Sequence, residues 1–238
     1  MDPRCGTPRP TLLCLPHAGG SAAFFRPWQA RLAGVAHVIP VEIAGHGARR
    51  SESPPTTLDA AIASVWPAVC GHAEQEYAVF GHSLGALYAF ELARRLVRPP
   101  RALVVSGRNA PARSAEMPQC HELPDEAFSE RLASYGGIPP EIYRDPELMR
   151  LFRPALRADM RIAEQYRRPD GPSLRCPIIV LYGDRDPLVS PAGVALWRSE
   201  TSGRCEIVPV PGDHFCLRDA VFTDRLALAL ARATATSA

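Results

Sequence analysis

The stretch from Tyr77 to Leu96, YAVFGHSLGALYAFELARRL, constrains the fold of this chain more than any other. It opens with an apolar run short enough for a buried strand and continues into apolar residues at helical spacing. Between them, residues 81–85 (GHSLG) form a G-x-S-x-G pattern. A strand, a sharp turn and a helix make Ser83 a candidate nucleophile, because only glycines leave room for the strand and helix to close around it. The alternative, an ordinary glycine-containing turn with a solvated serine, fits the two flanks less well.

The composition is that of one folded domain. With 238 residues, 46% hydrophobic and 22% charged, the chain is long enough to bury a substantial core as a single domain over 1–238. The net charge of +2 provides no bulk electrostatic attraction for nucleic acid. All 27 basic residues are arginine. Seven scattered cysteines without a C-x-x-C pair argue against a disulfide framework and a zinc site, so we expect free thiols in a reducing compartment.

No segment predicts export or membrane insertion. The first ten residues have no apolar core of the kind that a signal peptide needs, and no run reaches membrane-spanning length. We therefore expect a soluble, cytoplasmic and monomeric protein that binds neither nucleic acid nor membranes.

Strand-like and helical segments alternate along the chain. Apolar runs predict strands at 11–15, 35–43, 77–80, 102–105, 177–182 and 206–210. Helical patterns lie between and after these strands, for example at 24–32, 57–69, 194–199 and 219–233. This order predicts an α/β fold with a mostly parallel central sheet and helices on both faces. From about 109 to 170 only short helical patterns appear, so we interpret this segment as a helical insertion that forms a lid.

Three polar residues follow predicted strands in the order serine, aspartate, histidine. They are Ser83, an aspartate of the YGDRDP loop, and His214. Catalytic groups of parallel sheets lie at the carboxyl ends of strands, and this chain order is that of the α/β-hydrolases. Asp184 lies in the strand-exit turn and is able simply to close it. Asp186 lies deeper in the loop, so we favour Asp186 over Asp184 as the residue that orients His214.

The other histidines have weaker claims to act as the base. His82 adjoins Ser83 but is expected to point away from it and to pack. His17 lies in the small-residue loop after the first strand and is expected to line the pocket, while His46 lies in a glycine loop. His214 is the histidine that follows a late strand, at the position where a base is expected.

These positions predict acyl transfer through serine. His214 takes the proton of Ser83 during attack on a carbonyl, and water then releases the acid from the acyl-serine. The N–H groups of Ala18 and Leu84 are expected to hold the oxyanion, each such donor contributing on the order of 3 kcal/mol. This mechanism requires no metal and no cofactor.

Beyond these residues, six segments resemble the type II thioesterases, the stand-alone partners of polyketide synthases and nonribosomal peptide synthetases. They are LPHAGGSAAFF (15–25), GHSLGA (81–86), ELPDEAFSERLASYGGIPPEI (122–142), DPELMRLFRPALRADM (145–160), YGDRDPLVS (182–190) and GDHFCL (212–217). The resemblance implies hydrolysis of acyl thioesters on the phosphopantetheine arm of acyl- or peptidyl-carrier protein domains, often to clear stalled or aberrant groups. It assigns Ser83 as nucleophile, Asp186 as acid, His214 as base, and Ala18 and Leu84 as oxyanion donors.

The acyl pocket is predicted less sharply. We expect four residues to contact the substrate: His17, Phe24, Met160 and Phe215. Met160 stands where the family commonly has phenylalanine, and Cys216 stands where an aromatic residue is common. Further candidates within the lid, each of which is also suited to pack the lid onto the core, are Phe128, Leu132, Tyr135, Phe152 and Leu156.

Three questions stay open at this stage. The chain has the residues of an esterase acting on a free substrate as well, and a non-catalytic carrier-binding module is the more distant alternative. Seven arginines crowd the stretch from 144 to 168. They either attract an acidic carrier protein or pair with neighbouring acids on a solvated helix face, and the paired interpretation is favoured.

Overall fold

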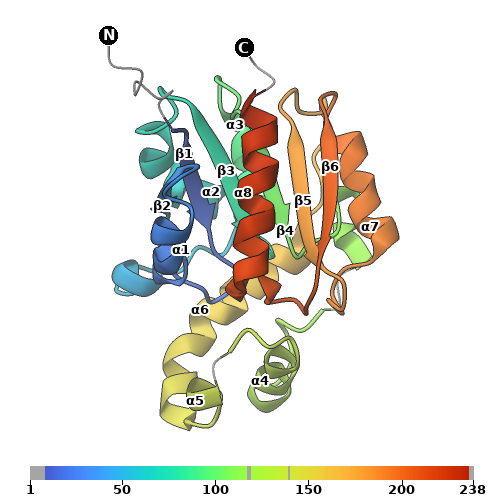
Figure 1. Ribbon diagram of the computed structural model, residues 1–238. Coiled ribbons are helices and arrows are strands. Elements are labelled where there is room, and N and C mark those ends of the chain that lie inside the picture. The colour runs from blue at the N-terminus through green and yellow to red at the C-terminus, as the bar shows by residue number, and fades with distance from the viewer. Residues whose placement is uncertain (1–8, 117–118, 139, 236–238) are drawn as a thin grey trace.

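Six parallel strands form one sheet in the computed structural model, which describes residues 9–116, 119–138 and 140–235 (Figure 1). The strand order is β2-β1-β3-β4-β5-β6, and every neighbouring pair is parallel. The strands are β1 (Thr11–Leu15), β2 (His37–Pro40), β3 (Tyr77–His82), β4 (Leu103–Ser106), β5 (Ile178–Gly183) and β6 (Cys205–Val210). The predicted α/β fold with a parallel sheet is confirmed.

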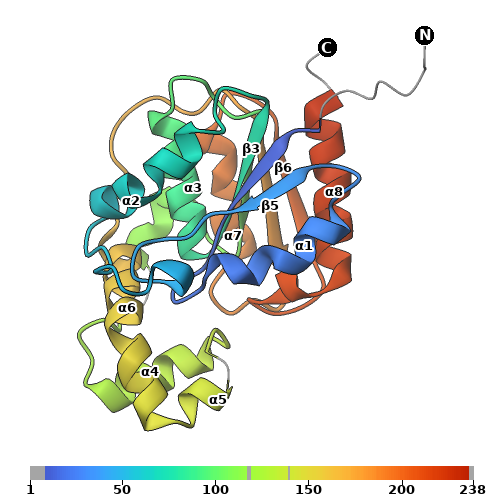
Figure 2. The same cartoon turned by 90° about the vertical axis from the view of Figure 1, so that its left-hand side faces the viewer.

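Helices cover both faces of the sheet (Figures 1 and 2). One face carries α1 (Arg26–Arg31) and α8 (Ala220–Ala235), and the other carries α2 (Leu58–Cys70), α3 (Leu84–Arg95) and α7 (Pro191–Ala195). Alternate strand residues belong to the two cores: Leu13 and Val79 pack on the α2–α3 side, and Leu12 and Phe80 pack on the α1–α8 side. Because both faces are covered, the strands are apolar throughout rather than alternating.

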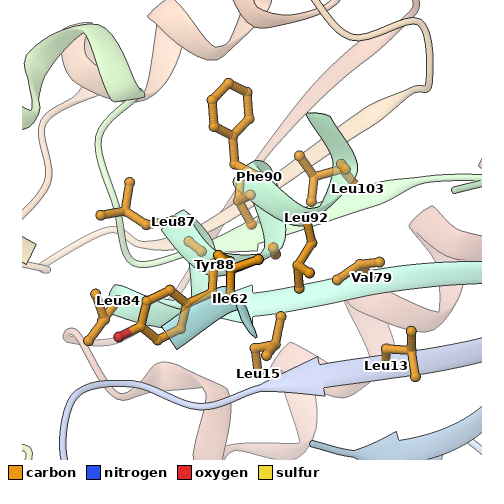
Figure 3. Packing of buried hydrophobic residues seen from close by; sticks show 14 of the residues in the cluster. Leu13, Leu15, Ile62, Val79, Leu84, Leu87, Tyr88, Phe90, Leu92 and Leu103 are labelled. Atoms are coloured by element: carbon orange, nitrogen blue, oxygen red, sulfur yellow. The ribbon is translucent and has the colours of Figure 1, made fainter. Parts of the chain in front are cut away.

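Helix α3 is buried almost all round. Its residues from Leu84 to Ala93 are all buried, and Glu91 is the one charged residue among them, as expected for a helix that is apolar on almost every side. Figure 3 shows Leu87 and Leu92 within the core that also holds Val79 of β3 and Leu103 of β4. This packing fixes α3 against the end of β3, and therefore fixes the turn between them.

The segment interpreted as a lid projects beyond the carboxyl ends of the strands (Figures 1 and 2). Residues 117, 118 and 139 of it lie outside the described residues. Its helices are α4 (Asp125–Ser134), α5 (Pro140–Tyr143) and the long α6 (Pro146–Gln165), preceded by a 3-10 turn (Pro111–Glu116). It has a small core of its own, formed by Cys120, Phe128, Leu132, Leu156 and Met160.

Two helix boundaries differ from those expected. The helix predicted over 24–32 is a 3-10 turn (Ala22–Phe25) followed by α1. The helix predicted at 194–199 begins earlier, at Pro191, because the Ser190 hydroxyl accepts the Gly193 N–H at 3.0 Å and caps α7. A 3-10 turn (Leu196–Glu200) then follows α7.

Candidate active site

Ser83 occupies a strained turn between β3 and α3. Its φ is +54° and its ψ is −113°, and among the described residues no other non-glycine residue has a positive φ. A Cβ atom at Gly81 would lie 2.0 Å from the Gly85 carbonyl oxygen, and one at Gly85 would lie 2.3 Å from the Leu15 carbonyl oxygen. The two glycines of the motif are therefore required by close backbone approach, and they hold Ser83 at the carboxyl end of the sheet.

An aspartate–histidine pair lies in the loops that follow β5 and β6. His214 Nδ1 and Asp186 Oδ2 are 2.7 Å apart, and both residues are buried. The second carboxylate oxygen of Asp186 accepts the Leu188 N–H at 2.8 Å. Asp184, in contrast, has a side chain that is 48% exposed and accepts the Gly212 N–H. The structure thus brings Asp186, not Asp184, to His214.

Ser83 and His214 line one cavity beneath the lid. Within the described part of the chain the two side chains do not hydrogen-bond to each other, a common situation for catalytic groups without substrate. The cavity encloses about 50 Å3, whereas one water needs roughly 10–15 Å3. It has room for a small acyl group, and a long one requires lid residues to move. Its apolar wall consists of Leu132, Tyr135, Ile138, Leu156, Met160 and Leu188.

The two expected oxyanion donors lie beside Ser83. Leu84 is the first residue of α3. The N–H groups of the first turn of a helix have no partner within the helix. Ala18 lines the cavity, in the loop that the hydrogen bond from Gly20 N–H to the His17 carbonyl closes at 2.9 Å. Among the described residues, neither the Ala18 N–H nor the Leu84 N–H has a hydrogen-bond acceptor.

Two further histidines pack near His214. The His82 ring lies 4.8 Å from the His214 ring, and His82 Nδ1 is 3.2 Å from the Ser106 hydroxyl. Burial, together with the neighbouring His214, holds the pKa of His82 well below its usual value and lowers the pKa of His17 to about 3. The His17 and His82 rings are therefore neutral near pH 7. Of the three histidines in this cluster, His214 is the one that contacts a carboxylate, that of Asp186.

Asp159 of the lid helix α6 ties the lid to the sheet, a contact that the sequence analysis missed. Its Oδ2 accepts the Gly19 N–H at 2.7 Å and lies 2.9 Å from His46 Nε2. Burial opposes protonation of His46, but the hydrogen bond and charge of Asp159 outweigh it and raise the pKa of His46. A Cβ atom at Gly19 would lie 2.3 Å from Leu156, so α6 presses directly on the loop that carries Ala18.

The expected substrate contacts divide into two groups. His17, Met160 and Phe215 line the cavity. Phe24 does not appear in its wall, because its ring packs edge-on behind His17 at 5.2 Å. Of the further lid candidates, Leu132, Tyr135 and Leu156 line the cavity. Phe128 is fully buried inside the lid, and Phe152 is 41% exposed.

The described residues hold neither a metal cluster nor a membrane-spanning helix. Within them, no cluster of three or more histidine, cysteine, aspartate or glutamate side chains has the arrangement of a metal site. No helix in the same residues has the length and apolar character needed to cross a membrane. The six cysteines in this part of the chain are free.

The fold and site together define the class of protein. A serine at a strand–helix elbow, an aspartate and a histidine after later strands, and a helical lid over a parallel sheet are the features of an α/β-hydrolase. Within that class, the chain belongs to the Thioesterase domain family, whose model matches residues 10–230.

Two named proteins and one solved structure are similar to this chain over most of its length. The chain is 38% identical to the thioesterase PikA5 of Streptomyces venezuelae, over 87% of this chain and 75% of that protein. It is 36% identical to the linear gramicidin dehydrogenase LgrE of Brevibacillus parabrevis, over 84% of this chain and 79% of that protein. The structure of the type II thioesterase BorB, from the borrelidin biosynthetic cluster, is similar with a TM-score of 0.84 and 41% identity, covering 94% of this chain and 93% of BorB.

Proposed function

We propose that this protein is a type II thioesterase that hydrolyses acyl thioesters on the phosphopantetheine arm of acyl- or peptidyl-carrier domains, in polyketide or nonribosomal peptide synthesis. Its role there is to clear stalled or aberrant acyl groups. The observation that carries the proposal is the cavity shared by Ser83 and the Asp186–His214 pair, in a chain of the Thioesterase family. An activated serine hydrolyses the thioester when water accepts the acyl group from the acyl-serine.

The mechanism uses the residues in the roles expected of them. His214 Nε2 takes the Ser83 proton as the hydroxyl oxygen attacks the thioester carbonyl, and the N–H groups of Ala18 and Leu84 hold the oxyanion. The intermediate collapses, the C–S bond breaks, and the pantetheine sulfur leaves with the proton from His214. Water then attacks the acyl-serine carbonyl while His214 takes its proton. The Ser83 oxygen leaves with that proton, and the free acid is released. Asp186 keeps Nδ1–H of His214 in place and stabilises the imidazolium.

The protein supplies no cofactor in this mechanism, since the phosphopantetheine belongs to the substrate. The dehydrogenase name of LgrE gives no second candidate for this chain. The sequence of this chain contains no G-x-G-x-x-G pattern of the kind that binds a dinucleotide at a strand–helix turn. The first strand instead leads into the HAGGS loop, which holds an expected oxyanion donor.

The partner and setting follow from the substrate. Carrier domains lie on cytoplasmic synthases, so we place the protein in the cytoplasm, as a monomer that meets its partner transiently. Light scattering of the purified protein measures its mass, and a stable dimer would contradict the proposed monomeric state.

The experiment that tests the function compares substrates. Hydrolysis of an acyl group on a carrier protein should proceed with a much higher kcat/KM than hydrolysis of a p-nitrophenyl ester of the same acid. The reverse preference would identify an esterase that acts on free esters.

The nucleophile is tested separately. Ser83→Ala should abolish both reactions, a loss of several orders of magnitude, because no other group forms the acyl-enzyme. A fluorophosphonate should add one adduct to the wild-type protein, as read by intact-mass analysis, and none to the variant. An adduct on another residue would refute the assignment of Ser83.

A further inference from the structure

Asn109, three residues after the end of β4, connects that strand to the loop that carries Asp186. Its side-chain oxygen accepts the Ser190 N–H at 3.0 Å, and its side-chain nitrogen lies 3.5 Å from the Leu188 carbonyl oxygen. The Ser190 N–H is a donor with no alternative role, so it settles which end of the amide faces it.

The surrounding backbone leaves this amide little freedom. A Cβ atom at Gly193 would lie 2.1 Å from the Asn109 side-chain oxygen, so the start of α7 packs directly against it. On either side of Asn109, the Ala110 N–H donates to the Gly193 carbonyl at 3.0 Å and the Arg108 carbonyl accepts the Trp197 indole N–H at 3.0 Å. Residues 108–110 are therefore fastened to the segment 190–197 on both sides of the Asn109 side chain.

The same loop sets the carboxylate of Asp186. The Leu188 N–H donates to Asp186 Oδ1 at 2.8 Å, while Asp186 Oδ2 faces His214 Nδ1 at 2.7 Å. Asp186 thus accepts the Leu188 N–H, while the Asn109 side chain contacts the Leu188 carbonyl and the Ser190 N–H. We infer that Asn109 is a positioning residue for the hydrolysis: it fixes residues 188–190 so that the Leu188 N–H orients the Asp186 carboxylate toward His214. This inference rests on the proposed function, in which Asp186 orients the base.

The test measures kcat and KM separately with a small acyl-pantetheine thioester. Asn109→Ala removes the acceptor, and Asn109→Leu removes it while keeping most of the side-chain volume. Both should lower kcat between about 10- and 100-fold, as a displaced catalytic group does. KM should change much less than kcat, because Asn109 does not line the cavity and, of the residues 188–190 that it fixes, only Leu188 does. Asn109→Asp keeps an acceptor for the Ser190 N–H and should retain most of kcat. A kcat like that of the wild type in folded Asn109→Ala or Asn109→Leu would overturn the inference.

Thr201 provides the matched control. Its hydroxyl also fastens a buried loop, bonding to the Cys176 carbonyl at 2.7 Å and the Gly203 N–H at 2.9 Å, but far from Asp186 in the fold. Thr201→Val should therefore lower the melting temperature and leave kcat unchanged. If Thr201→Val lowers kcat as much as Asn109→Leu does, loss of kcat reports general destabilisation and the positioning role is refuted.

A double-mutant cycle separates this inference from the function on which it rests. In the Asp186→Asn background, Asn109→Leu should cause little further loss, because residues that act through one another are strongly non-additive. Losses that multiply would show that Asn109 acts independently of Asp186 and would overturn the inference alone. An Asp186→Asn variant with wild-type kcat would instead refute the proposed acid, and the positioning role with it.

Discussion

Asp184 and Asp186 lie two residues apart in one loop, and their surroundings give them different roles. Asp186 is 6% exposed and uses both carboxylate oxygens, one toward His214 and one toward the Leu188 N–H. The Asp184 side chain is 48% exposed and accepts the Gly212 N–H across the neighbouring turn. The first arrangement orients an imidazole, and the second closes a loop.

The two aspartates are therefore expected to differ in mutants. Asp186→Asn should lower kcat by about 10⁴-fold with the fold intact, because the amide stabilises the wrong tautomer of His214. Asp184→Asn keeps a side-chain oxygen for the Gly212 N–H and should change kcat only slightly. Steady-state kinetics on an acyl-pantetheine thioester, with circular dichroism as the check on folding, measure both. A larger loss in Asp184→Asn would mean that the wrong aspartate has been assigned.

At the scale of elements, the sequence predicts what neighbouring residues determine. The G-x-S-x-G turn is recognisable because its glycines and its two apolar flanks are local, and the strands follow from apolar runs. Only the Gly81 contact lies within the motif, whereas Gly85 closely approaches Leu15 of the neighbouring strand β1, which no local pattern reveals. The order Ser83, Asp186, His214 then places three side chains at one edge of the sheet, because parallel strands share their direction.

Contacts between distant segments have no such pattern. Asp159 meets Gly19 across 140 residues of sequence and His46 across 113, and nothing in the residues around 159 distinguishes it from a solvated acid on a helix. The position of Phe24 behind His17, and of Phe128 inside the lid, likewise depends on how helices pack. Helical periodicity identifies an apolar face but not the surface that the face meets.

Asp159 is the contact through which the lid should stabilise the whole fold. It is 1% exposed, and its removal leaves His46 Nε2 and the Gly19 N–H without their partner. Asp159→Ala should lower the free energy of unfolding by about 3–5 kcal/mol, the usual result of breaking a buried pair from one side. Since Asp159 does not line the cavity, the folded variant should still hydrolyse thioesters. Urea unfolding and kinetics below the transition measure the two effects.

Glu147 offers the comparison for that experiment. It pairs with Arg150 on the same helix, but the two side chains are 78% and 70% exposed. Glu147→Gln should change the free energy of unfolding by no more than about 0.5 kcal/mol. Equal losses for Asp159→Ala and Glu147→Gln would contradict the anchoring role of Asp159.

At the scale of the whole molecule, two of the arginines on the lid hold the lid together. Arg153 and Arg157 both pair with Asp125 of α4, at 2.6 and 2.7 Å. The Arg157 guanidinium also lies 4.3 Å from the Phe128 ring centroid. These side chains fasten α4 to α6, which favours the paired interpretation over carrier docking for this pair of arginines.

Substrate comparison separates the two interpretations. Arg157→Gln should reduce kcat/KM by the same factor for an acyl-carrier protein and for an acyl-pantetheine thioester, because it loosens the lid over one shared cavity. The exposed Arg150, changed to Gln, should affect neither substrate appreciably. A loss in Arg157→Gln that is confined to the carrier substrate, and that vanishes in high salt, would instead show that Arg157 attracts the carrier.

The buried histidines should make the whole molecule sensitive to acid. His17 and His82 have pKa values lowered by burial, to about 3 for His17 and well below the usual value for His82. Below pH 6.5 the unfolded chain binds protons at both positions and the folded chain does not, so stability falls as pH falls. Well below pH 6.5 and above its folded pKa, His17 contributes up to about 1.4 kcal/mol per pH unit. The raised pKa of His46 acts in another window: its contribution is complete below pH 6.5 and is lost as pH rises above that value.

The expected outcome is a steep acid limb in the stability profile. Between pH 6.5 and 5, the free energy of unfolding from urea titrations should fall by about 1.6 kcal/mol through His17. His82, whose pKa is also lowered, should add to this fall. His17→Gln has no group to protonate at that position in the unfolded chain, so its free energy of unfolding should fall less steeply with pH. Thr201→Val is less stable at every pH but keeps both histidines, so its slope should match that of the wild type. A slope in His17→Gln equal to the wild-type slope would show that His17 is not the group that resists protonation in the fold.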